Sequence, residues 1–480
     1  MTAVSDSVPD SDSPGEAAFA SLSLPPELLG NLGSLGYHTM TPIQAASLPA
    51  MLAGRDVVAQ AKTGSGKTAA FGLGLLTRLT VSSFSVQALV LCPTRELADQ
   101  VAGEIRRLAR ALPNIKVLTL CGGAPLGPQL NSLAHGAHVV VGTPGRVEEH
   151  LRKGSLNLAT LDTLVLDEAD RMLDMGFQAA LEAIIGETPT SRQTLMFSAT
   201  GLQGEGAEGV RAIAEGFLRD PVNVAVSETH DETSIREHFY RLGDESERFE
   251  ALRLLLQHHR PQSSVVFCNT KRETDEVAEA LDQAGFSALA LHGDLEQRDR
   301  DRLLILFANK SASILVATDV AARGLDIDAL DAVFNYRIAR ELEVHVHRVG
   351  RTGRAGSSGV ACTLVSEQEA YRLERLGAFL EQQLVMEALP SRRALSGEPM
   401  APPMATLQLD GGKKQKVRPG DILGALTGDG GIRGDQVGKI KVLERSAYVA
   451  VQREVAKAAL AQLSAGKLKG RSFRARRVSR

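Results

Sequence analysis

The segment AKTGSGKT, residues 61–68, has the residue types and the spacing of a phosphate-binding loop. It lies between an apolar run, DVVAQ, and a helical pattern that begins TAAFGLGLL. In a strand–loop–helix of this kind, successive backbone N–H groups and the helix N-terminus surround phosphate oxygens. Lys67 would reach the β- and γ-phosphates of a nucleoside triphosphate, and the Thr68 hydroxyl would ligate Mg²⁺. The phosphate-contacting positions are then Ala61, Lys62, Thr63, Gly64, Ser65, Gly66, Lys67 and Thr68.

A magnesium–nucleotide site also needs carboxylates, and the segment TLVLDEAD, residues 163–170, supplies them. Asp167 and Glu168 follow an apolar run, at the position where a buried parallel strand ends and where α/β folds bind ligands. Asp167 suits coordination of Mg²⁺ through water, and Glu168 is placed to orient or deprotonate an attacking water. Taken alone, D-E-A-D also fits a helix N-terminus, where the dipole favours acids. The loop at 61–68 favours the nucleotide site over that alternative.

The sequence contains two sets of alternating strand and helix patterns, and these elements must position the residues above. Each set predicts a parallel sheet with helices on both faces, and therefore an α/β domain. The last 76 residues show the order βαββαβ of a small α+β, RRM-like domain. The predicted segments are an acidic, disordered N-terminus at 1–18, α/β domains at 19–226 and 235–385, linkers at 227–234 and 386–404, and the α+β domain at 405–480.

The charge of the chain is divided unevenly between these segments. The 480 residues carry a formal net charge of −3, yet residues 405–480 contain 17 Lys and Arg against 6 Asp and Glu. A module with an excess of eleven positive charges is a candidate for binding a phosphate backbone. A solvated basic face that only aids solubility is the alternative.

The remaining composition favours a protein of a reducing compartment. The four cysteines lie far apart without a C-x-x-C pair, and three of them adjoin apolar runs as small core residues do. The N-terminus has neither the basic nor the apolar region of a signal peptide, and no apolar run is long enough to span a membrane. We therefore expect a soluble, cytoplasmic protein that does not associate with membranes.

Taken together and in order, the motifs resemble those of the DEAD-box RNA helicases. The first domain has AKTGSGKT, PTRELADQ, TPGR, DEAD and SAT. The second has SVVFCNT, LHGDLEQRDR, ATDVAARGLDI and HRVGRTGRAG. The resemblance covers residues 19 to about 385 and implies two RecA-like domains, ATP and Mg²⁺ as cofactors, and RNA-dependent ATP hydrolysis.

The resemblance assigns further residues to the ATP site. Gln44 would bond the adenine edge and Phe19 would stack on the ring, although Phe19 alone also fits an ordinary core aromatic. Asp326 would hold the ribose, and Arg351 and Arg354 would reach the γ-phosphate from the second domain. Hydrolysis would then require closure of the two domains, which couples ATP to RNA binding. The residues implied to transmit this coupling are Asp170, Ser198, Thr200 and His347.

The RNA-contacting motifs of the family are also present, as small hydroxyl, glycine and Arg positions. Such groups bind phosphate and ribose rather than reading bases, so we expect little sequence preference and local strand separation. Two departures from the family are Met40, in place of a usual Pro, and Arg337, in place of a usual acidic residue. The positions implied to contact RNA are Arg95, Gly123, Thr143, Gly145, Arg146, Thr270, Gln297, Arg300 and Thr318.

The basic module resembles the C-terminal domain of a bacterial branch of the family that is associated with 23S ribosomal RNA. This resemblance implies a structured hairpin near the peptidyl transferase centre and pre-50S particles as partners, with no required protein partner. In the third strand only Tyr448 remains of three aromatic positions, and it could stack on RNA or pack in the core. The cations expected to contact RNA are Lys439, Lys441, Lys467, Lys469, Arg471, Arg474 and Arg476.

The leading hypothesis is an ATP-dependent RNA helicase that remodels ribosomal RNA during assembly of the large subunit. One alternative is a non-catalytic clamp that binds ATP and RNA with little turnover; the presence of Lys67, Glu168, Arg351 and Arg354 disfavours it. The other is a DNA-directed translocase, which the ordered DEAD and SAT motifs disfavour.

Overall fold

The computed structural model divides the chain into two compact units. The described part of the first unit ends at residue 226, and that of the second begins at residue 235 and includes the C-terminal domain. The predicted linker at 227–234 and the N-terminal residues 1–17 lie outside the described residues. The structure describes residues 18–61, 64–199, 201–202, 207–226, 235–322, 330–353, 359–428, 431–468 and 470–478.

The first unit is built on a seven-stranded sheet in the order β3-β4-β2-β5-β6-β1-β7, with every neighbouring pair parallel. Parallel neighbours need crossover connections, which the helices provide. The strands are β1 (Val57–Gln60), β2 (Ala88–Leu91), β3 (Val117–Leu120), β4 (Val139–Gly142), β5 (Thr163–Leu166), β6 (Gln193–Ser198) and β7 (Val222–Ala225). The predicted parallel-sheet α/β fold is thus confirmed for this unit.

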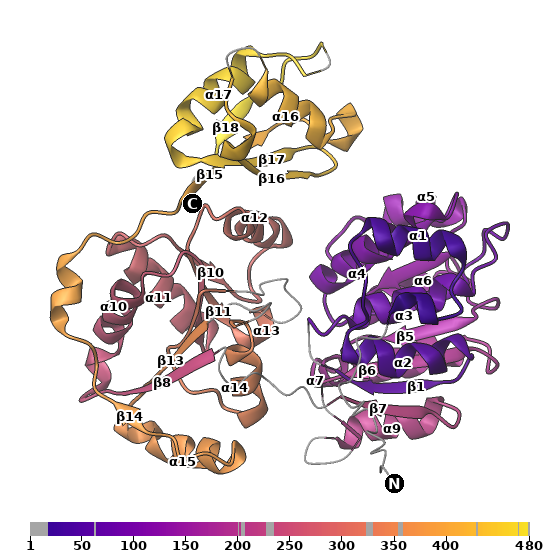
Figure 1. The fold of residues 1–480 in the computed structure, drawn as a ribbon, viewed down its shortest axis with the longest axis horizontal. Helices are drawn as coiled ribbons and strands as arrows, with labels where there is room; N and C mark the ends of the chain where they lie inside the picture. Colours follow the sequence, from indigo (N-terminus) through magenta and orange to yellow (C-terminus); the bar gives the residue numbers. More distant parts are fainter. Residues whose placement is uncertain are drawn as a thin grey trace, which may run out of the picture. The chain divides into compact units, whose positions relative to one another are not determined.

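Helices cover both faces of this sheet (Figure 1), because its strands are apolar on both sides. Along β1, for example, Val57 and Ala59 pack on one face and Val58 on the other. The helices are α1 (Pro26–Ser34), α2 (Pro42–Leu52), α3 (Lys67–Thr77), α4 (Arg95–Leu108), α5 (Leu126–Ala134), α6 (Pro144–Arg152), α7 (Ala169–Asp174), α8 (Gln178–Gly186) and α9 (Glu208–Phe217).

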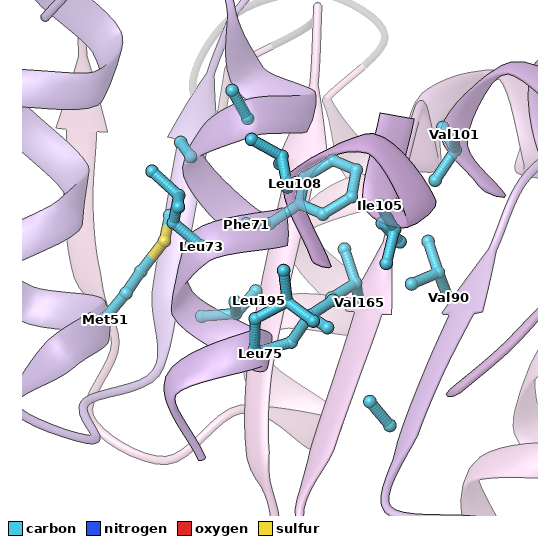
Figure 2. Close-up of a cluster of buried hydrophobic side chains, with 14 of the residues drawn as sticks. Met51, Phe71, Leu73, Leu75, Val90, Val101, Ile105, Leu108, Val165 and Leu195 are labelled. Atoms are coloured by element: carbon cyan, nitrogen blue, oxygen red, sulfur yellow. The ribbon is translucent and has the colours of Figure 1, made fainter. Parts of the chain in front are cut away.

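The core of this unit fixes the helix that begins at Lys67. Figure 2 shows Phe71, Leu73 and Leu75 of α3 among apolar side chains of α4 and of the sheet. Phe71 is fully buried and its ring lies 5.3 Å from that of Phe197 in β6. Because α3 is anchored along its length, the glycine loop before it is held against the ends of β1 and β6.

The second unit contains another seven-stranded parallel sheet, in the order β10-β11-β9-β12-β13-β8-β14. Its strands are β8 (Ile235–Arg241), β9 (Ser264–Cys268), β10 (Ala288–Leu291), β11 (Ile314–Thr318), β12 (Ala332–Asn335), β13 (Gly359–Val365) and β14 (Met386–Glu387). Its helices are α10 (Arg248–His259), α11 (Lys271–Gln283), α12 (Gln297–Ala308), α13 (Asp319–Ala322), α14 (Leu342–Val349) and α15 (Ala370–Phe379). Strand β14 lies inside the segment predicted as a linker, where a two-residue strand gives no periodic signal.

The same unit ends in a four-stranded antiparallel sheet in the order β16-β17-β15-β18. Two helices pack on one of its faces and close a separate core around Leu407 and Val449. The elements follow the predicted order βαββαβ, which confirms the α+β domain. They are β15 (Met404–Leu409), α16 (Pro419–Thr427), β16 (Val437–Val442), β17 (Ala447–Gln452), α17 (Ala456–Ala465) and β18 (Ala475–Arg477).

A buried arginine ties together the core of the second unit. The side chain of Arg248, at the start of α10, is 1% exposed and donates to both Glu245 and Glu369 at 2.6–2.9 Å. The same guanidinium donates to the backbone carbonyls of Tyr336, directly after β12, and of Leu364, within the neighbouring strand β13. A planar fork of five donors suits such a junction, because one side chain satisfies several acceptors at once.

Replacing Arg248 by Leu is therefore expected to destabilise the second unit by about 3–5 kcal/mol, because two carboxylates and two carbonyls lose their buried donor. Arg272→Leu is the matched control, since that side chain is 89% exposed and pairs with Glu276 on its own helix. Its loss should cost less than about 0.5 kcal/mol. Urea unfolding of the full chain measures both, and equal effects would show that the Arg248 junction contributes little.

Two further observations concern the described residues as a whole. No helix there is long and apolar enough to cross a membrane. The four cysteines are free and buried, and burial raises the pKa of the Cys121 thiol to about 12, so the thiol stays neutral near pH 7.

Candidate nucleotide and RNA site

The glycine loop has a backbone that only glycine adopts without strain. Gly64 and Gly66 have φ values of +87° and +91°. A Cβ at Gly66 would also lie 2.6 Å from Nε2 of Gln44. The loop is held from behind by α2, since Thr41 Oγ1 donates to the Ser65 carbonyl at 2.8 Å and Gln44 Nε2 donates to the Gly66 carbonyl at 3.0 Å. Sequence reasoning did not identify this role of Thr41.

At the mouth of the loop, the structure brings together Lys67, Asp167 and Glu168 as the sequence predicts. The Lys67 ammonium lies 2.8 Å from Oδ1 of Asp167 and 3.7 Å from Oε1 of Glu168. All three side chains are at most 5% exposed. Burial would lower the pKa of Lys67, but the two carboxylates outweigh burial and raise it. The lysine is therefore charged at neutral pH.

The carboxyl group of Asp167 has capacity for a further ligand. Burial raises its pKa, against the opposing effect of Lys67. Its Oδ2 accepts no hydrogen bond of normal geometry from the described residues. A buried oxygen without a donor is costly unless an ion or water satisfies it, and carboxylate and hydroxyl oxygens are ligands that Mg²⁺ prefers. Asp167 and the half-buried Thr68 thus fit a magnesium site.

Glu168 is oriented by its backbone and by an arginine of the next turn. It has a left-handed conformation, φ 54° and ψ 54°, and forms the N-cap of α7. Arg171 Nη1 donates to its Oε2 at 2.9 Å, within the protein interior. A non-glycine residue in this conformation stores strain that the surroundings must support. Arg171 is a second positioning residue that the sequence did not reveal. Its spacing of three residues from Glu168 occurs in many helical ion pairs and is therefore not distinctive.

The DEAD and SAT segments are joined directly. Oδ2 of Asp170 accepts a hydrogen bond from the Ala199 N–H at 3.0 Å, and Oδ1 accepts one from the Arg171 N–H. Ser198 ends β6, and its buried hydroxyl has no hydrogen-bond partner among the described residues. The expected coupling residue Thr200 lies outside the described residues.

The two residues expected to bind adenine have other contacts in this structure. Phe19 is 3% exposed and packs edge-on against Tyr37, with ring centroids 6.3 Å apart. Gln44 is 1% exposed; its Oε1 accepts from the Thr41 N–H at 2.9 Å while its Nε2 contacts the loop. Their roles toward adenine stay predictions.

The second unit holds the arginines of HRVGRTGR in different surroundings. Arg351 is 5% exposed, in the turn after α14, and His347 is half-buried in α14. Arg348 between them is 1% exposed, pairs with Asp319 at 2.5 Å and donates to Asn269 and Asn335. Its role is therefore structural. The expected site residues Arg354, Asp326, Lys62 and Thr63 lie outside the described residues.

The residues expected to contact RNA in the helicase domains lie where strands end and helices begin. In the first unit, Arg95 opens α4, Gly123 follows β3 with φ +72°, and Thr143 is the N-cap of α6, followed by Gly145 and Arg146. In the second unit, the expected residues are Thr270 as the N-cap of α11, Gln297 and Arg300 in the first turn of α12, and Thr318 at the end of β11.

The structure shows what the side chain contacts at each departure from the family pattern. Arg337 pairs with Glu245 at 2.5 Å and with Glu273 at 2.6 Å, so this position is part of an ion-pair network within its own domain. Met40 is partly buried and packs against the core of the first unit.

In the C-terminal domain, the predicted cations are exposed, except that Lys469 lies outside the described residues. Tyr448 is 8% exposed, but it alternates with Ala447 and Val449, which fill the core of its domain. Its side chain therefore belongs to the opposite face of the sheet. The exposed cations are Lys439, Lys441, Lys467, Arg471, Arg474 and Arg476.

Comparison with known proteins agrees with this geometry. Three family profiles match, described as DEAD/DEAH box helicase at residues 41–203, helicase conserved C-terminal domain at 247–356 and DbpA RNA binding domain at 406–477. The chain is 54% identical over 460 residues to the ATP-dependent RNA helicase DbpA of Escherichia coli, covering 96% of this chain and 99% of that protein. It is 42% identical to the DEAD-box ATP-dependent RNA helicase CshA of Geobacillus kaustophilus, covering 79% of this chain and 80% of CshA.

A solved structure has a similar fold. Dbp5 of S. cerevisiae, bound to RNA and ADP BeF3, is 30% identical with a TM-score of 0.69, covering 78% of this chain and 96% of that chain. The matched profiles, the extent of identity and the buried lysine–carboxylate cluster agree on one conclusion. The chain belongs to the DEAD-box ATP-dependent RNA helicases, and it carries an RNA-binding C-terminal domain similar to that of DbpA.

Proposed function

We propose that Lys67, Asp167 and Glu168 carry out the ATP hydrolysis of this helicase. The main support is the cluster itself, in which the buried ammonium of Lys67, at the start of α3, lies 2.8 Å from Asp167. Lys67 binds the β- and γ-phosphate oxygens, together with the loop N–H groups at the helix N-terminus. Because burial excludes water, these interactions are stronger than they would be in solvent.

Asp167 and Thr68 would hold Mg²⁺, with water between the metal and the carboxylate. When bound, Mg²⁺ would neutralise charge on the phosphate oxygens. The open Oδ2 of Asp167 supports this assignment.

Glu168 orients and deprotonates the attacking water. Arg171 Nη1 donates to Oε2 of Glu168 at 2.9 Å and thereby fixes the orientation of the carboxylate that would face the water. General-base assistance of this kind contributes about 10²–10⁴-fold to a rate. In this proposal Arg351 and Arg354 stabilise negative charge on the phosphate that is transferred, and this role rests on the family resemblance alone.

Asp170, Ser198, Thr200 and His347 form the proposed link between nucleotide state and domain movement. The Asp170–Ala199 hydrogen bond supports it, because it joins the helix after Glu168 to the end of β6. The buried hydroxyl of Ser198 has no hydrogen-bond partner among the described residues, and a different conformation of this segment would supply one.

The RNA substrate proposed for this helicase is 23S ribosomal RNA, in the context of large-subunit assembly. The helicase domains offer hydroxyl, glycine and arginine groups, which contact RNA backbone rather than base edges. Preference for one RNA must then come from elsewhere, and the C-terminal domain carries the excess of positive charge. Its similarity to the DbpA RNA binding domain supports RNA binding by this domain, and the choice of 23S rRNA rests on the family resemblance.

Removing three exposed cations of the C-terminal domain is expected to lower the preference for ribosomal RNA without changing basal turnover. The variant is Lys439→Gln with Arg471→Gln and Arg474→Gln, and the measurement is ATPase rate against 23S rRNA and against poly(U). The RNA concentration for half-maximal stimulation should rise about tenfold for rRNA, because charge-assisted phosphate contacts are lost. Stimulation by poly(U) should stay within about twofold, because the helicase-domain contacts are intact.

The matched control is Lys413→Gln with Lys414→Gln and Lys457→Gln, which removes three other exposed charges from the same domain. Only the first variant should lose the preference. If both RNAs stimulated the ATPase of the unmodified protein equally, the proposed targeting would be contradicted. If both triple variants lost the preference for 23S rRNA equally, the domain would act only as a general electrostatic anchor.

A further inference from the structure

The outer face of the C-terminal sheet, the face opposite the α16 and α17 side, is covered rather than free. Thr406 and Ala450 on this face are each 1% exposed, and Tyr448 and Gln408 are 8% and 9% exposed. None of the four belongs to the core of its own domain, whose strand residues alternate with them. Another part of the same unit must therefore cover the face.

The covering element is α12 of the helicase domain and the turn that follows it. The Thr406 hydroxyl accepts from Asn309 Nδ2 at 3.0 Å and lies 2.7 Å from Ser311 Oγ. The Met404 N–H donates to the Lys310 carbonyl at 3.3 Å. Because Asn309 and Thr406 are both buried, these contacts fix β15 against the end of α12.

Beyond this junction, toward the start of α12, the two surfaces separate and enclose a cavity of about 320 Å³. One wall comes from the first turns of α12, with Arg298 and Arg302. The other comes from the sheet, with Gln408, Tyr448 and Arg476. A volume of this size lies at the lower end of the range of ligand sites, about 300–1,000 Å³, which suits a single nucleotide.

On the sheet side, the strand register places these side chains in one row across all four strands. Lys441 pairs with Tyr448, Tyr448 with Gln408, and Gln408 with Arg476. Directly paired residues share a face, so the row runs from a cation through an aromatic ring and an amide to a second cation. An aromatic ring between cations is the arrangement that stacks a base while neutralising its phosphates.

On the helix side, Arg298 and Arg302 are four residues apart and share one face of α12. Glu296 and Asp299 also line the cavity, against four arginines, Arg298, Arg302, Arg476 and Arg477, so that the lining has a net positive charge. The ligand that fits is anionic and carries a planar group. The first turn of α12 also holds Gln297 and Arg300, the expected helicase-domain RNA contacts, so an RNA strand there lies next to the cavity.

We propose that this cavity is a composite RNA site that binds one nucleotide of a single-stranded segment, between α12 and the outer sheet face. Tyr448 stacks on the base, Gln408 offers its amide to the base edge, and Arg298, Arg302 and Arg476 bind the flanking phosphates. The inference rests on the proposed function, since it names where RNA that is held by the C-terminal domain meets the helicase domain.

The test uses the full chain and a fluorescein-labelled 23S rRNA hairpin with a single-stranded extension, with Kd measured by anisotropy over a range of KCl concentrations. In Arg298→Gln with Arg302→Gln, Kd should rise about tenfold. The slope of log K against log salt should become shallower by about 1.4, at about 0.7 per phosphate contact on a single strand. Arg272→Gln with Arg375→Gln, which removes two charges from α11 and α15, should leave the slope unchanged.

A second variant tests the base contact. Tyr448→Leu keeps the apolar bulk but removes the stacking surface, and should raise Kd by about 5- to 150-fold, whereas Tyr448→Phe should not. Combined with the α12 variant, the effects should be less than multiplicative, because both walls hold the same nucleotide. Multiplicative effects would overturn the composite site.

Unchanged Kd and unchanged slope in both variants would show that the face is a docking contact only. ATPase rate at saturating poly(U) separates this proposal from the proposed function. It should stay at the unmodified level in both variants, and its loss would show that these residues act in turnover rather than in a separate RNA site. Absence of RNA-stimulated ATPase in the unmodified protein would instead refute the proposed function.

Discussion

Replacing Glu168 by Gln is expected to lower the rate of RNA-stimulated ATP hydrolysis by about 10²–10⁴-fold while ATP binding persists. The amide keeps the size of the side chain and can still face Arg171, 2.9 Å away, but it cannot accept a proton from water. The ammonium of Lys67 stays next to Asp167, so the phosphate-binding loop keeps its electrostatics. Single-turnover hydrolysis gives the chemical step, and titration with a fluorescent ATP analogue gives the affinity.

Glu182→Gln is the matched control for this substitution. Glu182 is an exposed carboxylate of α8 that accepts a hydrogen bond from Gln178 on the same helix, and its loss should leave the rate unchanged. Hydrolysis by Glu168→Gln at the unmodified rate would exclude this carboxylate as the general base. Loss of ATP binding along with turnover would point to a collapse of the cluster instead.

Replacing Lys67 by Gln is expected to abolish ATP hydrolysis and also to destabilise the first unit by about 3–5 kcal/mol near neutral pH. The reason is that the buried carboxylates of Asp167 and Glu168 lie 2.8 and 3.7 Å from the ammonium, and both lose this cation when Lys67 is replaced. Urea unfolding at pH 8 and at pH 5 measures this penalty. Lys153→Gln, on the surface of the same unit and 49% exposed, is the control.

The penalty of Lys67→Gln should shrink as the pH falls. Burial already raises the pKa of Asp167 and Lys67 opposes it, so removal of Lys67 raises that pKa further. A group whose pKa is higher in the folded state than in the unfolded state binds more protons when folded, at any pH between these two pKa values. Acidification through that window therefore stabilises the variant relative to pH 8, and a penalty of equal size at both pH values would contradict this explanation.

Asp167→Asn in the Lys67→Gln background provides a second check. It removes the buried charge that the missing ammonium leaves behind, so part of the lost free energy of unfolding should return. ATP turnover should not return, because neither the phosphate-binding cation nor the carboxylate is present.

The sequence by itself determined that Lys67, Asp167 and Glu168 would lie together, and it determined the order of the elements. A glycine loop must lie between a strand and a helix to expose its N–H groups, and an acidic pair after an apolar run must lie at a strand end. These are local requirements, which explains why Lys67, Asp167 and Glu168 could be placed before any contact was known. The order βαββαβ followed from apolar periodicity in the same way.

Only the tertiary structure decided which partners these residues have. Thr41 and Gln44 hold the glycine loop, and Arg248 joins three segments, through contacts between residues that are distant in the sequence. Arg171 orients Glu168 within one helix turn, whose sequence has no distinctive pattern. Periodicity reports which face of an element is apolar, but it does not say what covers that face.

The same limit explains Tyr448. Its alternation with Ala447 and Val449 leaves stacking and packing equally compatible with the sequence. The structure shows that it lies on the outer face and lines a cavity with α12. This arrangement depends on how Thr406 meets Asn309, 97 residues away. Contacts across such separations are set by the packing of whole domains, which no local pattern encodes.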